Sequence, residues 1–295
     1  MVSLVNKLNI NHNIYEYTGK VPENTFYQYC TGELSEGGEE GIIDRLLSDL
    51  EVKEGWFCDF GAHNGISNSN TYSLVQRGWK GVAIEGDTGK YNQLCTNYMG
   101  YPNVICKNSY VQASGELSLD NILGKTSIPR YFDVLSIDID HDDYHVWKEL
   151  KNYRPKIVVI EYNPYRDPVC EQLPGDKEFK PSQNKDILVH VNPERMGNGT
   201  SFRAMIKLGL SKGYIPVACT GNLIFVRRDL VDRVSFPHVV TNNTKAYLYL
   251  YPRFFRSAGK WVTNNLLRYN CIVRDQYLKT GVYDIDLASI NFADV

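Results

Sequence analysis

The feature that most constrains this chain is an alternation of short β-rich apolar runs with amphipathic stretches from about Gly55 onward. Such alternation predicts a mostly parallel α/β sheet with helices on both faces. Seven strands are expected, at Trp56–Phe60, Gly81–Glu85, Asn103–Lys107, Phe132–Asp138, Lys156–Glu161, Tyr214–Cys219 and Asn222–Arg227. Apolar spacing predicts helices at Gly38–Leu50, Asn70–Arg77, Lys90–Tyr98, Tyr144–Lys151 and Phe202–Lys212.

The last two predicted strands are separated only by Thr220 and Gly221, which is too short for a parallel crossover. These strands must therefore form an antiparallel hairpin. Pro216 indicates an edge position for the sixth strand, because proline cannot donate a hydrogen bond to a neighbouring strand. Five strands with helical crossovers followed by such a hairpin are typical of the Rossmann-like class I methyltransferase fold, whereas a dinucleotide-binding domain ends in a parallel sixth strand.

The length of 295 residues and the hydrophobic content of 43% allow one good-sized core. We expect a main domain at 35–230, an N-terminal extension at 1–34 and an aromatic-rich C-terminal extension at 231–295. The connection at 163–199 is rich in Pro, Asn and Gly, and a connection of this length is typical of an inserted lid or binding loop or of a disordered segment. The C-terminal extension is expected to form a helical cap or a partner surface.

The formal charge of -2 and the pI of about 6.3 give no global attraction to nucleic acid, so no nucleic-acid partner is expected. We expect no signal peptide, because the apolar stretch at the N-terminus is short and interrupted by polar residues, and no membrane span, because no uninterrupted apolar run reaches the roughly 18 residues that a span needs. The seven cysteines include no C-x-x-C pair and are interpreted as reduced thiols. A cytoplasmic location is expected, and the oligomeric state is left open.

The strongest chemical signal is the glycine-containing turn from Asp59 to Gly65 that follows the first strand. Glycines there let the backbone approach a ligand closely, and the aspartate can bind its polar groups. The second strand ends in Glu85, which is placed to accept both ribose hydroxyls of an adenosine. The residues expected to bind this cofactor are Asp59, Gly61, Ala62, His63, Asn64, Gly65, Asn70, Glu85, Gly86 and Asp87.

Three features favour S-adenosylmethionine over NAD as the cofactor. The turn reads D-x-G-A-x-x-G instead of G-x-G-x-x-G, a hairpin ends the sheet, and nothing is typical of a hydride-transfer site. The alternative interpretation is a turn that binds no ligand, with Glu85 in solvent. Within the turn, His63 is expected to act through its backbone.

The residues that carry a family resemblance lie mainly in this half of the chain. They are Ser35–Ile43, Phe57–Ala62, Ser69–Thr71, Gly78–Gly81 and Ile84–Asp87. The chain resembles FkbM-type methyltransferases from about Ser35 to Arg228. Through Leu135–Asp140 and Ile160–Asn163 it is also similar to members that large algal viruses encode and that methylate glycan sugars. The resemblance implies S-adenosylmethionine as cofactor and a sugar, glycan or other hydroxyl-bearing acceptor.

A second cluster, Asp138 to Asp143, follows the fourth strand, where ligands bind in open α/β sheets. An acceptor hydroxyl must lose its proton to become a good nucleophile, and His141 is the candidate general base. Asp138 and Asp140 are further candidates for catalysis. With Glu161 and Asn163 after the fifth strand, they offer oxygen ligands for Mg²⁺ or a similar divalent cation.

Other interpretations of this cluster stay open. Asp142 and Asp143 are interpreted as acidic residues of the first turn of the next helix, where carboxylates bind free backbone N–H groups. His141 is either a base or an ordinary loop residue. Metal-dependent sugar and catechol O-methyltransferases carry ligands on these same two strands, but their acidic pair on the fifth strand is here Glu161-Tyr162-Asn163. The candidates to line an acceptor site are Tyr162, Tyr165, Arg166 and Arg203. The alternative for them is an ordinary loop or surface role, which is favoured for Arg166.

The predicted function is S-adenosylmethionine-dependent O-methylation of a sugar or glycan. One alternative is a methyltransferase that acts on nitrogen or on another small molecule. A second is a non-catalytic binding module with the same fold, and a third is an enzyme that uses NAD or a nucleotide sugar.

Overall fold

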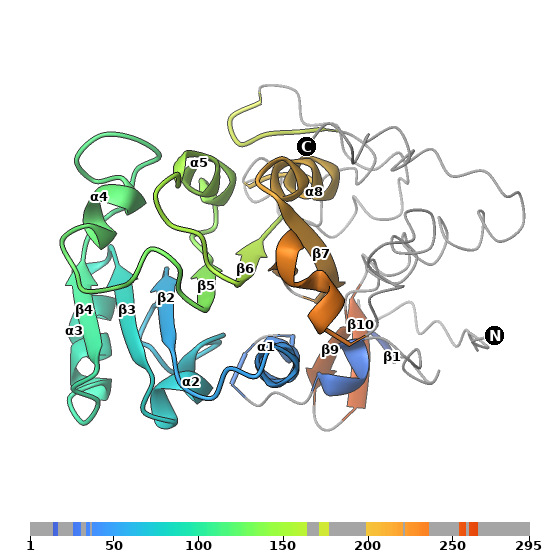
Figure 1. Ribbon diagram of the computed structural model, residues 1–295, viewed down its shortest axis with the longest axis horizontal. Coiled ribbons are helices and arrows are strands. Elements are labelled where there is room, and N and C mark those ends of the chain that lie inside the picture. The colour runs from blue at the N-terminus through green and yellow to red at the C-terminus, as the bar shows by residue number, and fades with distance from the viewer. Residues whose placement is uncertain are drawn as a thin grey trace, which may run out of the picture.

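The computed structural model describes residues 14–16, 26–30, 34–35, 37–163, 171–176, 199–220, 222–235, 254–257 and 260–264. Within these residues, seven strands form the main sheet in the order β4-β3-β2-β5-β6-β8-β7 (Figure 1). The strands are β2 (Trp56–Phe60), β3 (Lys80–Glu85), β4 (Val104–Asn108), β5 (Val134–Ile137), β6 (Ile157–Glu161), β7 (Tyr214–Cys219) and β8 (Asn222–Arg227). All seven predicted strands are therefore present, with ends that differ by two residues or fewer.

Helices lie on both sides of this sheet. They are α1 (Glu39–Asp49), α2 (Tyr72–Gln76), α3 (Thr88–Asn97), α4 (Leu119–Leu123), α5 (Asp143–Glu149) and α8 (Phe202–Ser211), with 3-10 turns η1 (Phe26–Tyr29) and η2 (Arg228–Arg233). Figure 1 shows α4, α5 and α8 along one side of the sheet and α1 and α2 along the other. The sequence did not predict α4, although α2, which is equally short, was predicted.

The predicted hairpin is confirmed. Strands β2 to β6 pair in parallel, whereas β8 is antiparallel to both β6 and β7. Pro216 lies in β7, which is the last strand of the sheet, next to a register shift between Pro216 and Ala218. The proline therefore occupies an edge strand, as predicted, and this strand order is that of the class I methyltransferase fold.

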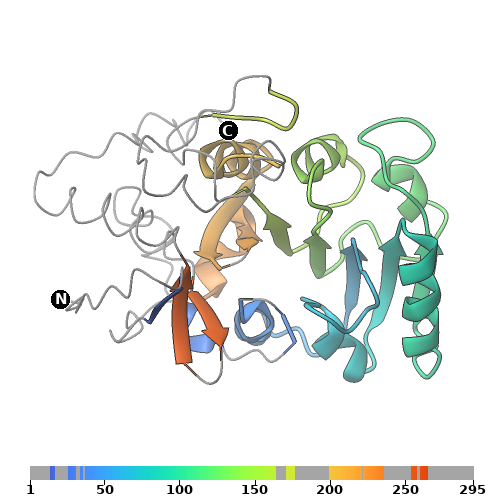
Figure 2. The same cartoon turned by 180° about the vertical axis from the view of Figure 1, so that it is seen from behind.

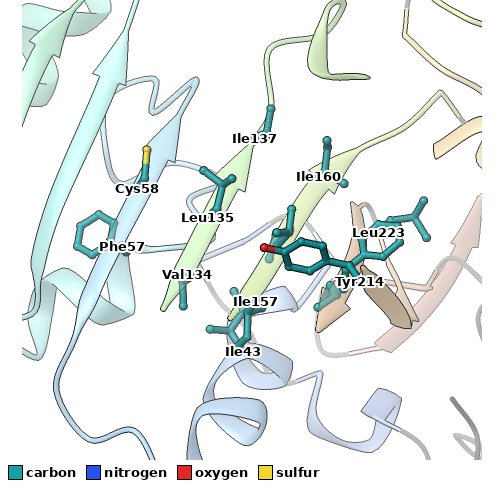
Figure 3. Close-up of a cluster of buried hydrophobic side chains, with 14 of the residues drawn as sticks. Ile43, Phe57, Cys58, Val134, Leu135, Ile137, Ile157, Ile160, Tyr214 and Leu223 are labelled. Carbon is teal, nitrogen blue, oxygen red and sulfur yellow. The ribbon is translucent and has the colours of Figure 1, made fainter. Parts of the chain in front are cut away.

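The central strands are buried on both faces, which explains their almost continuous apolar sequences. Every residue of β5 is buried, as are the first four residues of β6. Figure 3 shows part of this core, in which Ile43 of α1 and Tyr214 of β7 accompany side chains from the central strands. Cys58 and Cys219 are buried free thiols, in agreement with the expected reduced state.

The two extensions contribute a separate three-stranded antiparallel sheet of order β1-β10-β9. Its strands are β1 (Ile14–Glu16), β9 (Phe254–Ser257) and β10 (Lys260–Asn264). It lies on the side of the molecule where β7 lies (Figures 1 and 2). The described part of the C-terminal extension thus contains strands where a helical cap was one expectation. Most of the predicted inserted loop at 163–199 lies outside the described residues.

Candidate functional site

A cavity of about 600 Å³ lies at the carboxyl ends of the parallel strands. Residues that follow β2, β3, β4 and β5 line it, together with the last residue of β6 and the first residue of β8. Both clusters predicted from the sequence therefore contribute to the same cavity. Of the predicted site residues, those that line it are Asp59, Gly61, Ala62, His63, Asn70, Glu85, Gly86, Asp87, Asp138, Asp140, His141 and Glu161.

The turn after β2 approaches the loop after β5 so closely that Gly61 has no room for a side chain. A Cβ atom there would lie 1.8 Å from the carbonyl oxygen of Asp138. Gly61 also has a φ of +84°, which favours glycine. The backbone N–H groups of Gly61 and Ala62 both donate to the carbonyl of Ile84, at 3.0 Å. This glycine therefore brings the ends of β2, β3 and β5 together.

The carboxylate of Glu85 is held in a fixed orientation by two backbone groups. Oε2 accepts a hydrogen bond from the N–H of His63 at 2.8 Å, and Oε1 accepts one from the N–H of Asp87 at 2.7 Å. His63 has a φ of +50° and contributes its backbone here, in agreement with the expectation. Each carboxylate oxygen has a second lone pair, so Glu85 retains acceptor capacity for ligand hydroxyls.

Asp59 is buried within a set of hydroxyl groups. The Thr71 hydroxyl donates to its Oδ2 at 2.7 Å. Burial raises the pKa of Asp59 to about 6, although hydrogen bonds with Thr71, Ser136 and Ser69 lower it. The sequence identified Asp59 but not these partners, which come from distant positions and meet only in the folded sheet.

Two predicted cofactor residues shape the turn and do not line the cavity. Asn64 Oδ1 accepts hydrogen bonds from the N–H groups of Ile66 and Ser67. Gly65 has a φ of +80°, and a Cβ atom there would lie 2.6 Å from Leu94. Asn64 and Gly65 therefore support the backbone around the cavity from outside it.

The cavity residues that follow β4 were not predicted from the sequence. Ser109, Tyr110 and Val111 line the cavity, and the Tyr110 ring occupies the space that a Cβ atom of Gly86 would need, 2.5 Å away. The available signal was their position, because they follow the carboxyl end of a parallel strand exactly as the other site residues do. Lys90 and Asn222 also line the cavity and were not predicted.

The acidic group at the ends of β5 and β6 is the second part of the site. Carboxylate oxygens of Asp138, Asp140 and Glu161 lie within 4.8 Å of one another. Asp140 has a φ of +64°, in the left-handed region. Asn163, the fourth predicted metal ligand, does not line the cavity, and its backbone N–H donates to the carbonyl of Thr200 at 2.7 Å.

Asp143 is a buried carboxyl that stabilises the loop after β5. Its Oδ1 accepts a hydrogen bond from the N–H of Ile139 at 2.9 Å. Burial, followed by the negative charge of Asp138, raises its pKa to about 7. Asp143 lies in the first turn of α5 as predicted, whereas Asp142 is the N-cap residue but makes no side-chain capping bond.

His141 lines the cavity with a half-exposed side chain, and its Nε2 lies 3.9 Å from Asp142 Oδ1. Of the residues expected at an acceptor site, Tyr162 is buried against Phe202 with ring centroids 5.7 Å apart. Arg203 lies 3.4 Å from Glu171. Neither lines the cavity, while Tyr165 and Arg166 lie outside the described residues.

The strand order and the position of the cavity define the class I methyltransferase fold. No protein-family model matches the sequence, and no curated protein matches it. In no helix within the described segments is there a stretch long and apolar enough for a membrane crossing.

Solved structures with distant similarity include methyltransferases. Coclaurine N-methyltransferase, bound to N-methylheliamine and SAH, matches at 9% identity and a TM-score of 0.29, over 45% of this chain and 42% of that one. The YcgJ protein of Bacillus subtilis matches at 13% identity and a TM-score of 0.36, over 58% of this chain and 68% of that one. A dimethyladenosine transferase of Plasmodium falciparum matches at 16% identity and a TM-score of 0.33, over 65% of this chain and 61% of that one. The fold assignment rests on the strand order of the main sheet.

Proposed function

We propose that this protein transfers a methyl group from S-adenosylmethionine to a hydroxyl group of a sugar or glycan. The observation that carries the proposal is that two groups of residues line the same cavity. One is Glu85, whose carboxylate is oriented by two backbone N–H groups, and the other is His141 with the acidic group after β5. A nucleoside cofactor and an acceptor can then meet in one space, as direct methyl transfer requires.

The charge of the cavity supports this cofactor over NAD. The carboxylates that line it are those of Asp59, Glu85, Asp87, Asp138, Asp140, Asp142 and Glu161, whereas the residues with basic side chains are Lys90, His63 and His141. S-Adenosylmethionine supplies a methyl group on a positively charged sulfonium, which an acidic cavity attracts. The pyrophosphate of NAD is an anion that these carboxylates would repel.

We assign the cofactor half to the residues after β2 and β3. Glu85 would accept the ribose hydroxyls, and Asp59 would bind a positively charged or polar group of the cofactor. The glycine at 61 allows the turn to lie against the loop after β5, because a side chain there would clash with the carbonyl oxygen of Asp138.

We assign activation of the acceptor to the residues after β5. His141 would accept the proton of the acceptor hydroxyl, which makes the oxygen a better nucleophile. Asp138, Asp140 and Glu161 would hold a divalent cation such as Mg²⁺, which lowers the pKa of a bound hydroxyl. The assignment of a sugar rests on the resemblance to FkbM-type enzymes, and the polar lining of the cavity fits a hydroxyl-rich acceptor.

The first test is calorimetry of the full chain with S-adenosylmethionine, S-adenosylhomocysteine and NAD. We expect micromolar binding of the first two and none of NAD. Glu85→Gln should weaken binding about 10- to 100-fold, because hydrogen bonds to a charged group contribute about 1.5–3 kcal/mol. Glu54→Gln, on an exposed residue away from the cavity, is the matched control and should leave binding unchanged.

Other outcomes would contradict the proposal. Binding of NAD alone would favour an NAD-dependent enzyme, and no binding by a well-folded chain would favour a binding module with this fold. If S-adenosylmethionine binds, incubation with neutral sugars and with amine acceptors separates O-methylation from N-methylation. Methylation of amines alone would refute the hydroxyl acceptor while the cofactor assignment stands.

A further inference from the structure

Asn222 lies beside the acidic group although it is distant from it in the sequence. It is the first residue of β8 and pairs in register with Glu161, the last residue of β6. Both residues line the cavity, and Asn222 is only 5% exposed. The antiparallel direction of β8 therefore brings a buried amide to the edge where the parallel strands end.

The amide of Asn222 has a defined orientation. Its Nδ2 donates to Glu39 Oε1 at 3.3 Å, whereas its Oδ1 has no hydrogen-bond partner within the described residues. Rotating the amide by 180° would turn Oδ1 towards the Glu39 carboxylate, which accepts hydrogen bonds and repels another acceptor. Burying an amide oxygen without a hydrogen-bond partner lowers the stability of the fold, unless a ligand binds to that oxygen.

Glu39 is a fully buried carboxylate that fixes this arrangement from α1. Its Oε1 also accepts hydrogen bonds from the Thr220 hydroxyl and from the Asn222 backbone N–H, and its Oε2 accepts one from the N–H of Gly37. These donors offset the cost of burying the charge. Glu39 therefore ties the start of α1 to the β7–β8 turn and sets the direction of the Asn222 amide.

We propose that Asn222 Oδ1 is an amide ligand of a divalent cation held by Asp138, Asp140 and Glu161, and that Glu39 is its positioning residue. The inference rests on the cation site of the proposed function. In it, Asn222 takes the place of Asn163, which was the amide ligand expected from the sequence. Carboxylate and amide oxygens together are the ligands that Mg²⁺ and similar hard cations prefer. Asn222 has an amide oxygen without a hydrogen-bond partner and lines the same cavity as the three carboxylates, which fits that donor set.

The test is calorimetric titration of the full chain with Mg²⁺ and with Mn²⁺. Asn222→Ala should weaken cation binding about 10- to 100-fold, the range typical of residues that support a metal site. Asn163→Ala is the matched control, since it removes an amide of the same size outside the cavity, and should change the affinity less than about twofold. Loss of binding in Asn163→Ala with unchanged binding in Asn222→Ala would overturn the inference.

A measurement on the unaltered chain covers the case in which Asn222→Ala does not fold. In protein labelled with ¹⁵N-asparagine, Mg²⁺ should shift the side-chain amide resonances of Asn222 with the dissociation constant found by calorimetry. Unchanged Asn222 resonances at saturating Mg²⁺ would refute the inference. Glu39→Gln should lower cation affinity beyond any effect on the melting temperature, whereas a purely structural Glu39 would change the melting temperature alone.

The failure of this inference can be distinguished from the failure of the proposed function. A chain that binds S-adenosylmethionine but neither cation would overturn the inference and leave cation-independent methyl transfer in place. Cation binding without cofactor binding, together with loss of affinity in Asn222→Ala, would support the site and contradict the methyltransferase proposal.

Discussion

Replacing Gly61 by alanine is expected to disrupt the contact between the turn after β2 and the loop after β5. The new Cβ atom would lie 1.8 Å from the carbonyl oxygen of Asp138, whereas Cβ atoms in proteins essentially never lie closer than 3.0 Å to another heavy atom of this kind. The neighbour is backbone, so it cannot rotate away as a flexible side chain would. Relief requires a shift of both loops, and these loops carry the two halves of the candidate site.

The expected cost has two parts, and Gly78 allows them to be separated. Both glycines have a positive φ, +84° at Gly61 and +79° at Gly78, but a Cβ atom at Gly78 would meet nothing within 4 Å. The left-handed backbone alone costs an alanine about 1–2 kcal/mol, which is the expected effect of Gly78→Ala. Overpacking adds about 1–3 kcal/mol, so Gly61→Ala should lose roughly 2–5 kcal/mol.

Urea unfolding and thermal melting of both variants measure the difference directly. One kcal/mol corresponds to about 2–4 °C for a domain of this size, so Gly61→Ala should melt clearly below Gly78→Ala. The folded fraction of Gly61→Ala should also bind S-adenosylmethionine more weakly, because the turn is displaced. Equal stability of the two variants, within about 0.5 kcal/mol, would refute the close approach of the two loops.

Three further changes test other parts of the site. Burial raises the pKa of Asp143 to about 7 from an ordinary value of 3.8, so its carboxyl stabilises the fold most at low pH, and this contribution is lost as pH rises towards 7. Asp143→Asn keeps an acceptor for the Ile139 N–H, and its melting temperature relative to wild type should rise by about 2–4 °C or more between pH 5 and pH 8. His141→Asn should lower kcat about 10²- to 10⁴-fold with unchanged S-adenosylmethionine affinity by calorimetry. Thr71→Val removes the hydroxyl that donates to buried Asp59 and should lower the free energy of unfolding by about 1–3 kcal/mol in urea.

Each of these variants has a control or a contradicting result. A difference in melting temperature between Asp143→Asn and wild type that stays the same from pH 5 to pH 8 would contradict the buried titration of Asp143. Thr96→Val, on the exposed face of α3, should change stability by less than about 0.5 kcal/mol. A fully active His141→Asn would exclude His141 as the base.

The part of the fold that the sequence predicts is the part set by local rules. Apolar runs define the strands, a two-residue connection defines the hairpin between β7 and β8, and Pro216 defines the edge. The sheet then follows, because parallel strands with helical crossovers leave few arrangements. The helix α4 was missed, and so was the three-stranded sheet of the extensions, whose pairing joins residues 14–16 to residues 260–264 and therefore depends on contacts that are distant in the sequence.

Site residues could be predicted where the surrounding segment alone marks a residue as a candidate. Glu85 and Gly61 are marked in this way, because a strand end and a glycine turn are visible in the sequence. The partners of Asp59 are not, since Thr71 and Ser136 reach it only when α2 and β5 pack against β2. Tyr110 was missed because no motif marks the segment that follows β4, and only its place after a parallel strand brings it to the cavity.

Asn163 and Asn222 differ in how their strands bring them to the edge of the sheet where the cavity lies. In a parallel sheet, each strand brings the residues that follow it to the ligand edge, so Asn163, two residues after Glu161, was the natural candidate. An antiparallel strand obeys the opposite rule and brings its first residue to that edge. Because β8 pairs with β6, its first residue, Asn222, lies opposite Glu161. A hairpin predicted from two connecting residues therefore implies that the beginning of its second strand belongs among the candidate site residues.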